Sequence, residues 1–362
     1  MSKDKAFHRV DGRNPFGAQA KLLWHSDRLC SFLRDGSAFP VHVEISPTST
    51  CNMTCEWCIS SYMRKSENID LKSLKRFLYK FREMGGRAVV WSGGGEPTLY
   101  PELEEAIEEA SCLNLKQGIF TNGLFPKRLI KRIGENMEWV RFALDTTDKK
   151  LFCEKKGVNE RAYEKVLANL KLLSVYPSRL IVNAELDKWN LSNMKNIIET
   201  SKAQGADIVQ IRPVLPRPYK DETVDSDFYA SCLPMLKELE EMGDKGCQVF
   251  ISWDKFDDFV DGEPYGRTYD KCQYHHFFFV LTANGDLGVC MYRLYDDNFI
   301  FGNIYKNSLE GIWQSEKRKE VIRHCNEDID FSKCQICCKG SELNKMLHFI
   351  QNPNPKSDPD FF

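Results

Sequence analysis

Two hydrophobic periodicities alternate along the chain from about residue 41. Short runs rich in Val, Ile, Phe and Leu have the length and composition of buried strands. They predict strands at 41–46, 87–91, 116–120, 139–145, 179–186 and 207–212. Between these runs, apolar residues recur every three or four positions, as amphipathic helices require. The clearest of these stripes consists of Tyr163, Val166, Leu167, Leu170 and Leu173. Such stripes indicate core packing, and we assign them no chemistry.

This alternation of strands and helices predicts the fold class. Six consecutive βα units favour an α/β fold in which a parallel sheet carries its helices outside and closes partway into a barrel, a partial (β/α)6 barrel. In folds of this kind the ligand binds at the carboxyl ends of the strands. We therefore expect the functional residues in the loops that follow the strands.

The remaining segments indicate how the chain is divided. Residues 1–40 form an N-terminal extension and 41–225 the barrel, which the chain leaves through three prolines between 213 and 218. A linker at 226–270 is expected to hold a helix near 226–242, a strand near 249–252 and a solvated acidic loop. The loop aspartates are too loosely spaced for a calcium site. A small α+β domain at 271–345 and a tail at 346–362 complete the division.

Composition narrows the class of protein. The 362 residues carry a net charge of −2 with both signs interspersed, so we expect no nucleic-acid-binding surface. The longest apolar run, 277–281, is too short to span a membrane. The polar N-terminus lacks the apolar core of a signal peptide. Fourteen cysteines in such a chain favour the reducing cytoplasm and metal–thiolate chemistry over disulfides.

Three of these cysteines, Cys51, Cys55 and Cys58, lie in the loop after the first predicted strand. Thiolates are ligands for zinc or for an iron–sulfur cluster. A structural zinc site or a closed cluster requires four protein ligands, and no further Cys or His follows closely. A four-iron cluster held by three cysteines keeps one iron open for another ligand. A zinc site completed by a distant cysteine is the alternative.

The C-x3-C-x2-C spacing, with Trp57 before the last cysteine, resembles the signature of the radical SAM superfamily. The resemblance implies that the open iron binds S-adenosylmethionine (SAM) and that the reduced cluster cleaves it to a 5′-deoxyadenosyl radical. After the second strand, Gly94-Gly95-Glu96-Pro97 is similar to the G-G-E-P motif of this family. By that resemblance, Gly94, Gly95 and Glu96 contact the methionyl amino group of SAM. Two motifs in register disfavour the zinc alternative.

Polar residues at the other strand ends are further candidates for contacts with SAM or substrate. Asn122-Gly123 follows the third strand, Asp145 ends the fourth, Asn190 follows the fifth and Arg212 ends the sixth. Of these, Asp145, Asn190 and Arg212 are predicted SAM contacts. Glu185, within the fifth strand, is a weaker candidate. Structural alternatives remain, because Asn-Gly is ordinary turn chemistry and an Asp can cap the next helix.

A second set of cysteines begins at Cys272. The runs 277–281 and 287–292 flank an Asn-Gly turn, which predicts a hairpin that folds Cys290 back toward Cys272. Cys334 and Cys337 follow a predicted helix at 308–324. This region resembles the twitch/SPASM extension of radical SAM enzymes, which implies one auxiliary [4Fe–4S] cluster. Zinc is the alternative metal here. The expected ligands are Cys272, Cys290, Cys334 and Cys337, with Cys325 or Cys338 as alternatives to Cys337.

The resemblance implies an anaerobic enzyme, reduced by flavodoxin or ferredoxin, that abstracts a hydrogen atom from a polar substrate. A fully ligated auxiliary cluster is suited to electron transfer, so we expect a two-electron oxidation. The twitch form resembles the aminocyclitol dehydrogenase type, and residues 1–40 are too few for a leader-peptide recognition domain. Both favour a sugar or aminocyclitol-like small molecule. The alternatives are epimerisation or cross-linking of a ribosomally made peptide, and a non-catalytic metal-binding scaffold.

Overall fold

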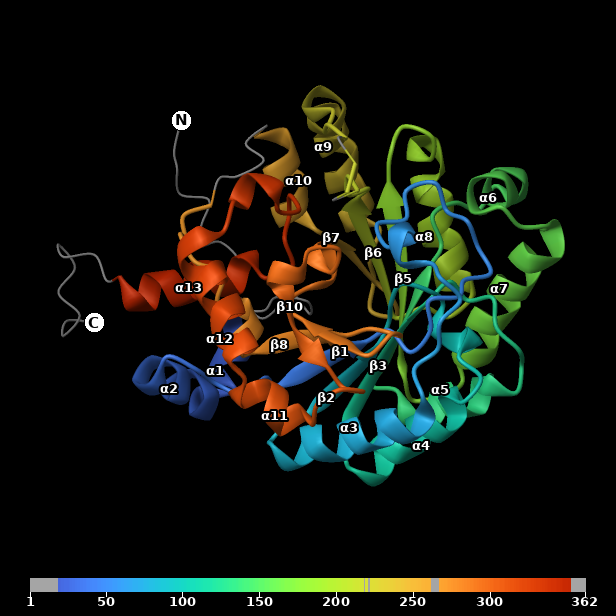
Figure 1. Ribbon diagram of the computed structural model, residues 1–362. Coiled ribbons are helices and arrows are strands. Elements are labelled where there is room, and N and C mark those ends of the chain that lie inside the picture. The colour runs from blue at the N-terminus through green and yellow to red at the C-terminus, as the bar shows by residue number, and fades with distance from the viewer. Residues whose placement is uncertain (1–18, 218, 221, 262–266, 353–362) are drawn as a thin grey trace.

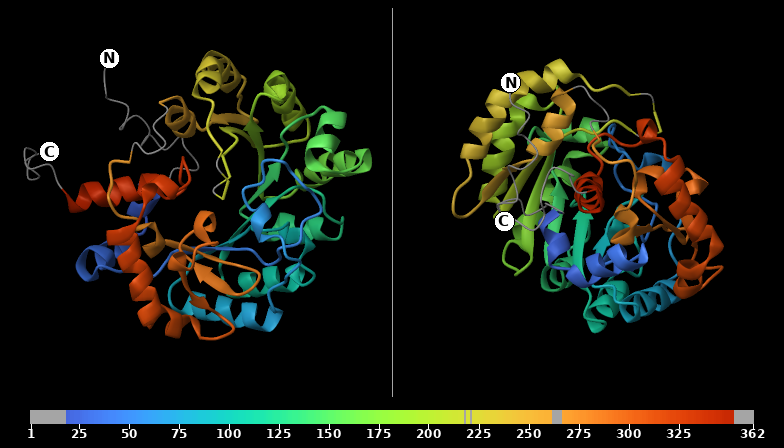
Figure 2. Two further views of the ribbon diagram at one scale, coloured as in Figure 1. Left: turned by 45° about the horizontal axis from the view of Figure 1, so that its top comes forward. Right: turned by 90° about the vertical axis from the view of Figure 1, so that its left-hand side faces the viewer.

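The computed structural model describes residues 19–217, 219–220, 222–261 and 267–352 (Figure 1). Parts of the predicted extension (1–18), linker (262–266) and tail (353–362) lie outside the described residues. A single ten-stranded sheet runs in the order β10-β9-β8-β1-β2-β3-β4-β5-β6-β7. Strands β1 to β7 are parallel, with helices on their outer side, so the expected α/β fold class is confirmed (Figure 2).

The strands are β1 (His42–Ile45), β2 (Ala88–Trp91), β3 (Lys116–Thr121), β4 (Trp139–Ala143), β5 (Arg179–Leu186), β6 (Ile208–Pro213), β7 (Gln248–Ile251), β8 (Phe278–Leu281), β9 (Asp286–Gly288) and β10 (Ile300–Asn303). The helices are α1 (Gln19–Leu23), α2 (Ser26–Asp35), α3 (Leu71–Glu83), α4 (Leu103–Cys112), α5 (Leu129–Asn136), α6 (Lys149–Lys156), α7 (Glu160–Leu173), α8 (Met194–Ala203), α9 (Ser226–Glu241), α10 (Trp253–Val260), α11 (Leu309–Gln314), α12 (Glu316–Arg323) and α13 (Ser341–Gln351). Among the described helices, none combines the length and the hydropathy that spanning a membrane requires.

Side chains alternate between the two faces of each barrel strand. Val140 and Phe142 of β4, like Val182 of β5, are fully buried in the main core beneath the outer helices. Because successive strand residues point to opposite faces, the residues between them face the inside of the barrel. Several of these inward residues are polar or charged, for example Arg141 and Asn183. The outer helices therefore pack on the apolar face of the sheet, and the polar inner face is the one suited to bind a ligand.

The sheet continues beyond the six strands that were expected. The strand expected near 249–252 within a linker is β7, at 248–251, and it pairs in parallel with β6. Val249 and Ile251 are buried in the main core, so this segment packs as barrel structure. The acidic loop expected after it is instead helix α10. Its buried residues Trp253, Phe256 and Phe259 recur at helical spacing, and this apolar stripe outweighs the aspartates between them.

The second cysteine region is built onto the edge of the barrel sheet. The predicted hairpin is present, with β8 and β9 antiparallel, and β8 also pairs in parallel with β1. A second apolar cluster joins α1 and α2 to this region through Leu22, Phe32 and Phe277. The ammonium of Lys339 lies 2.5 Å from the buried carboxylate of Glu44 on β1. The shared sheet therefore sets the placement of the two cysteine regions relative to each other.

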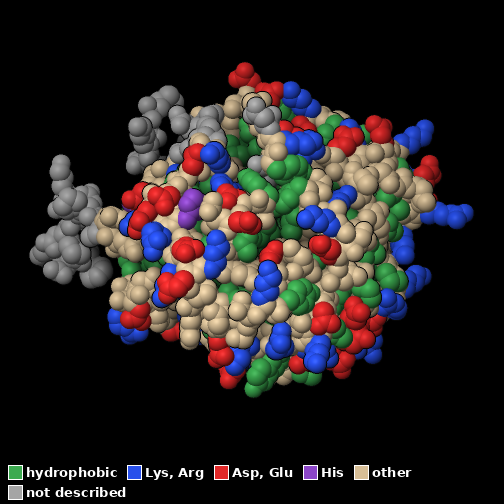
Figure 3. Space-filling view, viewed as in Figure 1, with side chains coloured by type: hydrophobic (Ala, Val, Ile, Leu, Met, Phe, Trp, Pro, Cys, Tyr) green, Lys and Arg blue, Asp and Glu red, His purple; other side chains and the backbone are tan. Residues whose placement is uncertain are grey.

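Charges of both signs are mixed over the face of the molecule seen in Figure 3, as the composition led us to expect. On this face, the basic side chains of the described residues form no extended patch.

The loops after β1 and β2 meet through their backbones. The amide of Glu96 donates to the carbonyl of Thr50 at 2.8 Å, and the amide of Gly94 donates to Ser46 Oγ at 2.8 Å. A Cβ atom on Gly95 would lie 2.2 Å from the Thr50 carbonyl oxygen. Only a glycine permits this approach without displacing the backbone. The glycine-rich loop thus supports the segment that leads directly into Cys51.

We expect Gly95→Ala to lower the free energy of unfolding by about 1–3 kcal/mol, the usual cost of overpacking. Urea denaturation of the apoprotein measures this change. Gly246→Ala is the matched control, since its new Cβ would meet only a carboxylate oxygen of Asp244 at 3.4 Å. Equal stability of the two variants would show that the loops do not depend on this contact.

Candidate active site

The first cysteine set lies in the loop that β1 delivers to the carboxyl end of the sheet. Cys51, Cys55 and Cys58 are each partly buried and lie within electrostatic reach of one another. Burial raises the pKa of Cys51, and it raises the pKa of Cys55 to about 11. Thiols bind metals as thiolates, so a group of buried thiols of this kind requires a cationic partner to ionise them. Three thiols of one loop are the donor set of a metal cluster that takes three protein ligands.

Hydrogen bonds hold this loop in place. The amide of Thr54 donates to the carbonyl of Lys156 at 2.9 Å, and Arg64 donates to the carbonyl of Met53 at 2.7 Å. Two of the sulfurs also receive donors. Arg64 Nη2 lies 3.5 Å from Cys58 Sγ, and Asn122 Nδ2 lies 3.9 Å from Cys51 Sγ. Such donors stabilise negative charge on sulfur.

Trp57, the predicted aromatic of the signature, faces the end of the barrel. Its ring centroid lies 4.9 Å from that of Trp189, and the ammonium of Lys156 lies 5.4 Å from the Trp57 ring. The end of the cysteine loop is therefore packed through Trp57 against the ring of Trp189 and the ammonium of Lys156.

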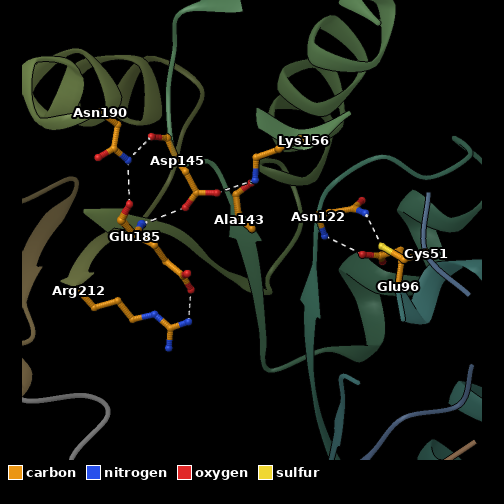
Figure 4. A network of polar contacts seen from close by, with 9 residues as sticks. All are labelled: Cys51, Glu96, Asn122, Ala143, Asp145, Lys156, Glu185, Asn190 and Arg212. Carbon is orange, nitrogen blue, oxygen red and sulfur yellow. Dashed lines mark hydrogen bonds and ion pairs between the residues drawn. The ribbon is translucent and has the colours of Figure 1, made fainter. Parts of the chain in front are cut away.

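Glu96 is buried and joins the loops that follow β2 and β3. Its Oε1 accepts hydrogen bonds from the Thr98 amide, the Thr98 hydroxyl and the Thr121 hydroxyl, the last two at 2.6 and 2.7 Å. Its Oε2 accepts from the amide of Asn122 at 2.7 Å (Figure 4). Burial raises the pKa of Glu96, and these donors oppose that rise. Protein donors thus orient the carboxylate of the G-G-E-P motif before any ligand binds.

Asn122 has the turn role that the sequence allowed, and it also contacts the cysteine loop. Its Oδ1 accepts from the amide of Leu124, and Gly123 has a φ of +81°, so the segment is a true turn. Its Nδ2 meanwhile faces Asn52 Oδ1 at 2.7 Å as well as the Cys51 sulfur. The turn is therefore what directs this amide at the cysteine loop.

Asp145 forms a buried ion pair that sequence reasoning missed. Its Oδ2 lies 2.5 Å from Lys156 Nζ, and both side chains are 1% exposed. Its Oδ1 accepts from the amide of Glu185 at 2.9 Å, and the following helix is capped by Asp148 instead. Burial acts to lower the pKa of Lys156, but the charge of Asp145 outweighs it and the pKa is raised. Nothing in the sequence separates Lys156 from the exposed lysines around it.

Asn190 connects the ends of β4 and β5. Its Nδ2 donates to the carbonyls of Asp145 and Glu185 at 2.7 and 2.8 Å, and its Oδ1 accepts from the amide of Asp187 at 2.9 Å (Figure 4). The amide group is buried and engaged within the protein. Arg212 lies opposite Glu185 in the β5–β6 register and pairs with it. The three predicted residues Asp145, Asn190 and Arg212 therefore belong to one network.

The second cysteine set lines a small cavity between the hairpin and the segment before α13. Cys272, Cys290, Cys334 and Cys338 contribute to its wall. Burial raises the pKa values of the Cys272 and Cys290 thiols well above the usual range. Two of the sulfurs receive donors, from Asn344 Nδ2 at 3.8 Å and from the Gly340 amide at 3.4 Å. Four partly buried thiols at one cavity are the donor set that a cluster ligated entirely by the protein requires.

The fourth thiol differs from the one that we expected. Cys337 points away from the cavity and donates to the carbonyl of Lys255 at 3.4 Å, whereas Cys338 lines it. Cys337 has a left-handed backbone with φ of +56°, which turns the chain so that the adjacent Cys338 reaches the cavity. Cys325 is fully buried close by, and its carbonyl accepts from the Cys272 amide at 2.9 Å. Spacing alone does not reveal such a turn.

Comparisons with known proteins agree with both cysteine sites. A family model for the radical SAM superfamily matches residues 45–183, and a model for the SPASM iron–sulfur cluster-binding domain matches residues 272–339. The chain is 22% identical over 315 residues to the tungsten-containing aldehyde ferredoxin oxidoreductase cofactor-modifying protein of Pyrococcus furiosus, covering 80% of this chain and 85% of that protein. It is 29% identical over 295 residues to a probable GTP 3′,8-cyclase of Sulfurisphaera tokodaii, covering 79% and 90%.

Solved structures share the fold. SuiB of Streptococcus suis bound to S-adenosylmethionine superimposes with a TM-score of 0.66 at 16% identity, covering 93% of this chain and 80% of that one. The anSMEcpe structure with bound AdoMet gives 0.62 at 20% identity, covering 84% and 88%. The two matched domains imply a SAM-binding [4Fe–4S] cluster and auxiliary iron–sulfur ligation. This chain belongs to the radical SAM superfamily and carries a SPASM iron–sulfur domain at its C-terminus.

Proposed function

We propose that this radical SAM enzyme carries out a two-electron oxidation of a polar small molecule. The observation that carries the proposal is the completeness of the second thiol set, in which four cysteines face one cavity. A site with four protein ligands leaves no position for substrate and is suited to accept an electron. The second candidate is modification of a peptide, which a curated relative favours. That relative is the PqqA peptide cyclase of Bradyrhizobium diazoefficiens, 23% identical over 316 residues.

Cys51, Cys55 and Cys58 would hold the SAM-binding cluster, which when bound supplies the electron that cleaves SAM reductively. The rest of the chain orients and shields the reactants. The G-G-E-P loop packs against the cysteine loop, and four donors from three residues already orient the Glu96 carboxylate. A pre-oriented carboxylate is suited to the methionyl ammonium of SAM because it pays little reorganisation on binding.

The ends of β4 and β5 have a separate role in this proposal. Asp145 pairs with Lys156 and accepts from the amide of Glu185. Asn190 donates to the backbone carbonyls of Asp145 and Glu185. We infer that Asn190 positions these strand ends instead of contacting SAM itself. The buried Asp145–Lys156 pair would then form a rigid wall between the cysteine loop and the inside of the barrel. Exclusion of water there protects a substrate radical from side reactions.

The chemistry balances as an oxidation. Transfer of one hydrogen atom to the 5′-deoxyadenosyl radical, from a carbon that bears a hydroxyl or amino group, would break one C–H bond and form 5′-deoxyadenosine. Loss of one further electron, accepted at the auxiliary site, and of one proton leaves a carbonyl or an imine. Polar groups on the inner barrel face, among them Asn183, Glu185 and Arg212, support a hydrophilic substrate such as a sugar or an aminocyclitol.

The reaction requires a small electron carrier, and we propose flavodoxin or ferredoxin for that role. The described structure contains all fourteen cysteines as free thiols. We propose the cytoplasm as the compartment, because two sets of cysteines suited to metal clusters are typical of a reducing environment.

Replacement of Cys55 by Ala is expected to reduce formation of 5′-deoxyadenosine to background while the fold remains intact. The reason is that a three-thiol site has no spare ligand. Anaerobic assay with dithionite and SAM, read by liquid chromatography, measures this loss, and circular dichroism checks the fold. Cys112→Ala, at an exposed position of α4, is the control. Undiminished product from the Cys55 variant would refute the assignment.

The two adjacent cysteines allow a direct test of the second site. Cys338→Ala should lose about four irons per chain, one cluster's worth, because its thiol lines the cavity. Cys337→Ala should keep them, since its thiol faces the Lys255 carbonyl. Iron and sulfide analysis after anaerobic reconstitution compares the two variants. Loss of iron from the Cys337 variant and its retention by the Cys338 variant would show that Cys337 is the ligand.

The reaction type is tested by the mass of the product. Anaerobic turnover of candidate metabolite extracts in deuterated buffer, read by mass spectrometry, should show a product lighter than its substrate by two hydrogens. A product of unchanged composition that carries one solvent deuterium on carbon would instead indicate epimerisation, and the oxidation proposal would fail.

A further inference from the structure

The wall of the second cavity contains positive charge and no carboxylate among the described residues that form it. Arg267 and Arg293 line the cavity beside the four thiols, and the described lining includes neither Asp nor Glu. The other lining side chains are apolar, aromatic or amide-bearing. Four thiolate ligands concentrate negative charge in a small space. The cations placed beside them therefore influence how readily this site takes up a further electron.

Both arginines also hold the segment that carries Cys334. Arg267 donates to the carbonyls three residues before and one residue after Cys334, at 3.2 and 2.9 Å. Arg293 Nη1 donates to the carbonyl of Lys333 at 3.2 Å. Three backbone carbonyls around Cys334 thus accept hydrogen bonds from guanidinium groups. These bonds fix the Cys334 thiol relative to both arginines.

Arg293 also reaches a sulfur directly. Its Nη1 lies 3.9 Å from Cys334 Sγ and donates to it. The guanidinium carbon lies 4.2 Å from the centroid of the Phe299 ring, and Nη2 donates to Asp296 Oδ2 at 2.8 Å. The ring and the carboxylate therefore fix the planar cation with Nη1 directed toward the Cys334 sulfur.

The ion pair of Arg293 offsets its charge only in part at the cavity. The Arg293 side chain is 7% exposed, whereas that of Asp296 is 24% exposed. Water screens the charge of the carboxylate more strongly than the charge of the buried guanidinium. Asp296 is also not among the described residues that line the cavity. The thiols therefore face the cation more closely than they face its partner.

We propose that Arg293 is a positioning residue of the second site, which acts through the Cys334 sulfur and raises the reduction potential of the auxiliary cluster. A hydrogen bond to a ligand sulfur and a cation in a poorly solvated space both stabilise the reduced state, because that state carries one more negative charge. Arg293 would thereby make the site a better electron acceptor. This inference rests on the proposed function, in which the auxiliary site accepts one electron from the substrate radical.

Anaerobic redox titration of the reconstituted holoprotein, followed by electron paramagnetic resonance, tests this inference. The same titration in the Cys55→Ala background identifies the signal of the second site, because the first site lacks a ligand there. We expect Arg293→Gln to lower the midpoint potential of the second site and to disfavour its reduction about tenfold, which is about 59 mV for a one-electron couple. Arg293→Lys, which keeps the charge and loses the fork, should lower it less. Arg323→Gln, which removes an exposed arginine at the end of α12, should leave it unchanged.

Three results would overturn the proposal. These are an unchanged midpoint potential in Arg293→Gln, a shift to higher potential, and an equal shift in the Arg323 variant. If Arg293→Gln does not retain the iron of the second site, Arg293→Lys decides, and an unchanged potential in that variant also overturns the proposal. The titration requires no substrate turnover. A lowered potential in a protein that releases no oxidised product would therefore support this inference while the proposed function fails.

Discussion

The backbone contact between Thr50 and the glycine-rich loop is the constraint on which the rest of the site depends. The amide of Glu96 bonds to the Thr50 carbonyl, and Gly95 leaves no space for a side chain between the two segments. Since Cys51 follows Thr50 directly, the loop after β2 determines where the Cys51 thiol can lie. Glu96 extends the same connection to the end of β3. These contacts fix the cysteine loop against the ends of two neighbouring strands.

The pairing of β8 with β1 has a comparable effect on the second site. Because β8 extends the barrel sheet, the hairpin that carries Cys290 is a continuation of the strand layer and shares its register. The Lys339–Glu44 pair connects the chain just beyond Cys338 to β1. Electron transfer between two sites depends on a constant separation. A shared sheet provides this constancy more reliably than a flexible linker would.

The charged groups inside the barrel hold the strand ends in one arrangement. A buried pair such as Asp145–Lys156 contributes little net stability, because desolvation offsets the attraction, but it enforces a unique arrangement. Nearby on the inner face, Arg141 donates to Asn183 and Arg212 pairs with Glu185, so neighbouring strands are also joined by polar contacts.

The sequence by itself determined the fold class, all six expected barrel strands, the hairpin and the family, because periodicity and cysteine spacing are local properties. It did not show that 248–251 completes the sheet or that 253–260 is helical, since prolines and aspartates concealed a buried apolar stripe. Only the tertiary structure placed Cys338 and not Cys337 at the second cavity, through a single left-handed residue. It alone also paired Lys156 with Asp145 and Arg212 with Glu185. Those contacts join residues on different elements, and the register and twist of the sheet that bring them together leave no mark in the local pattern.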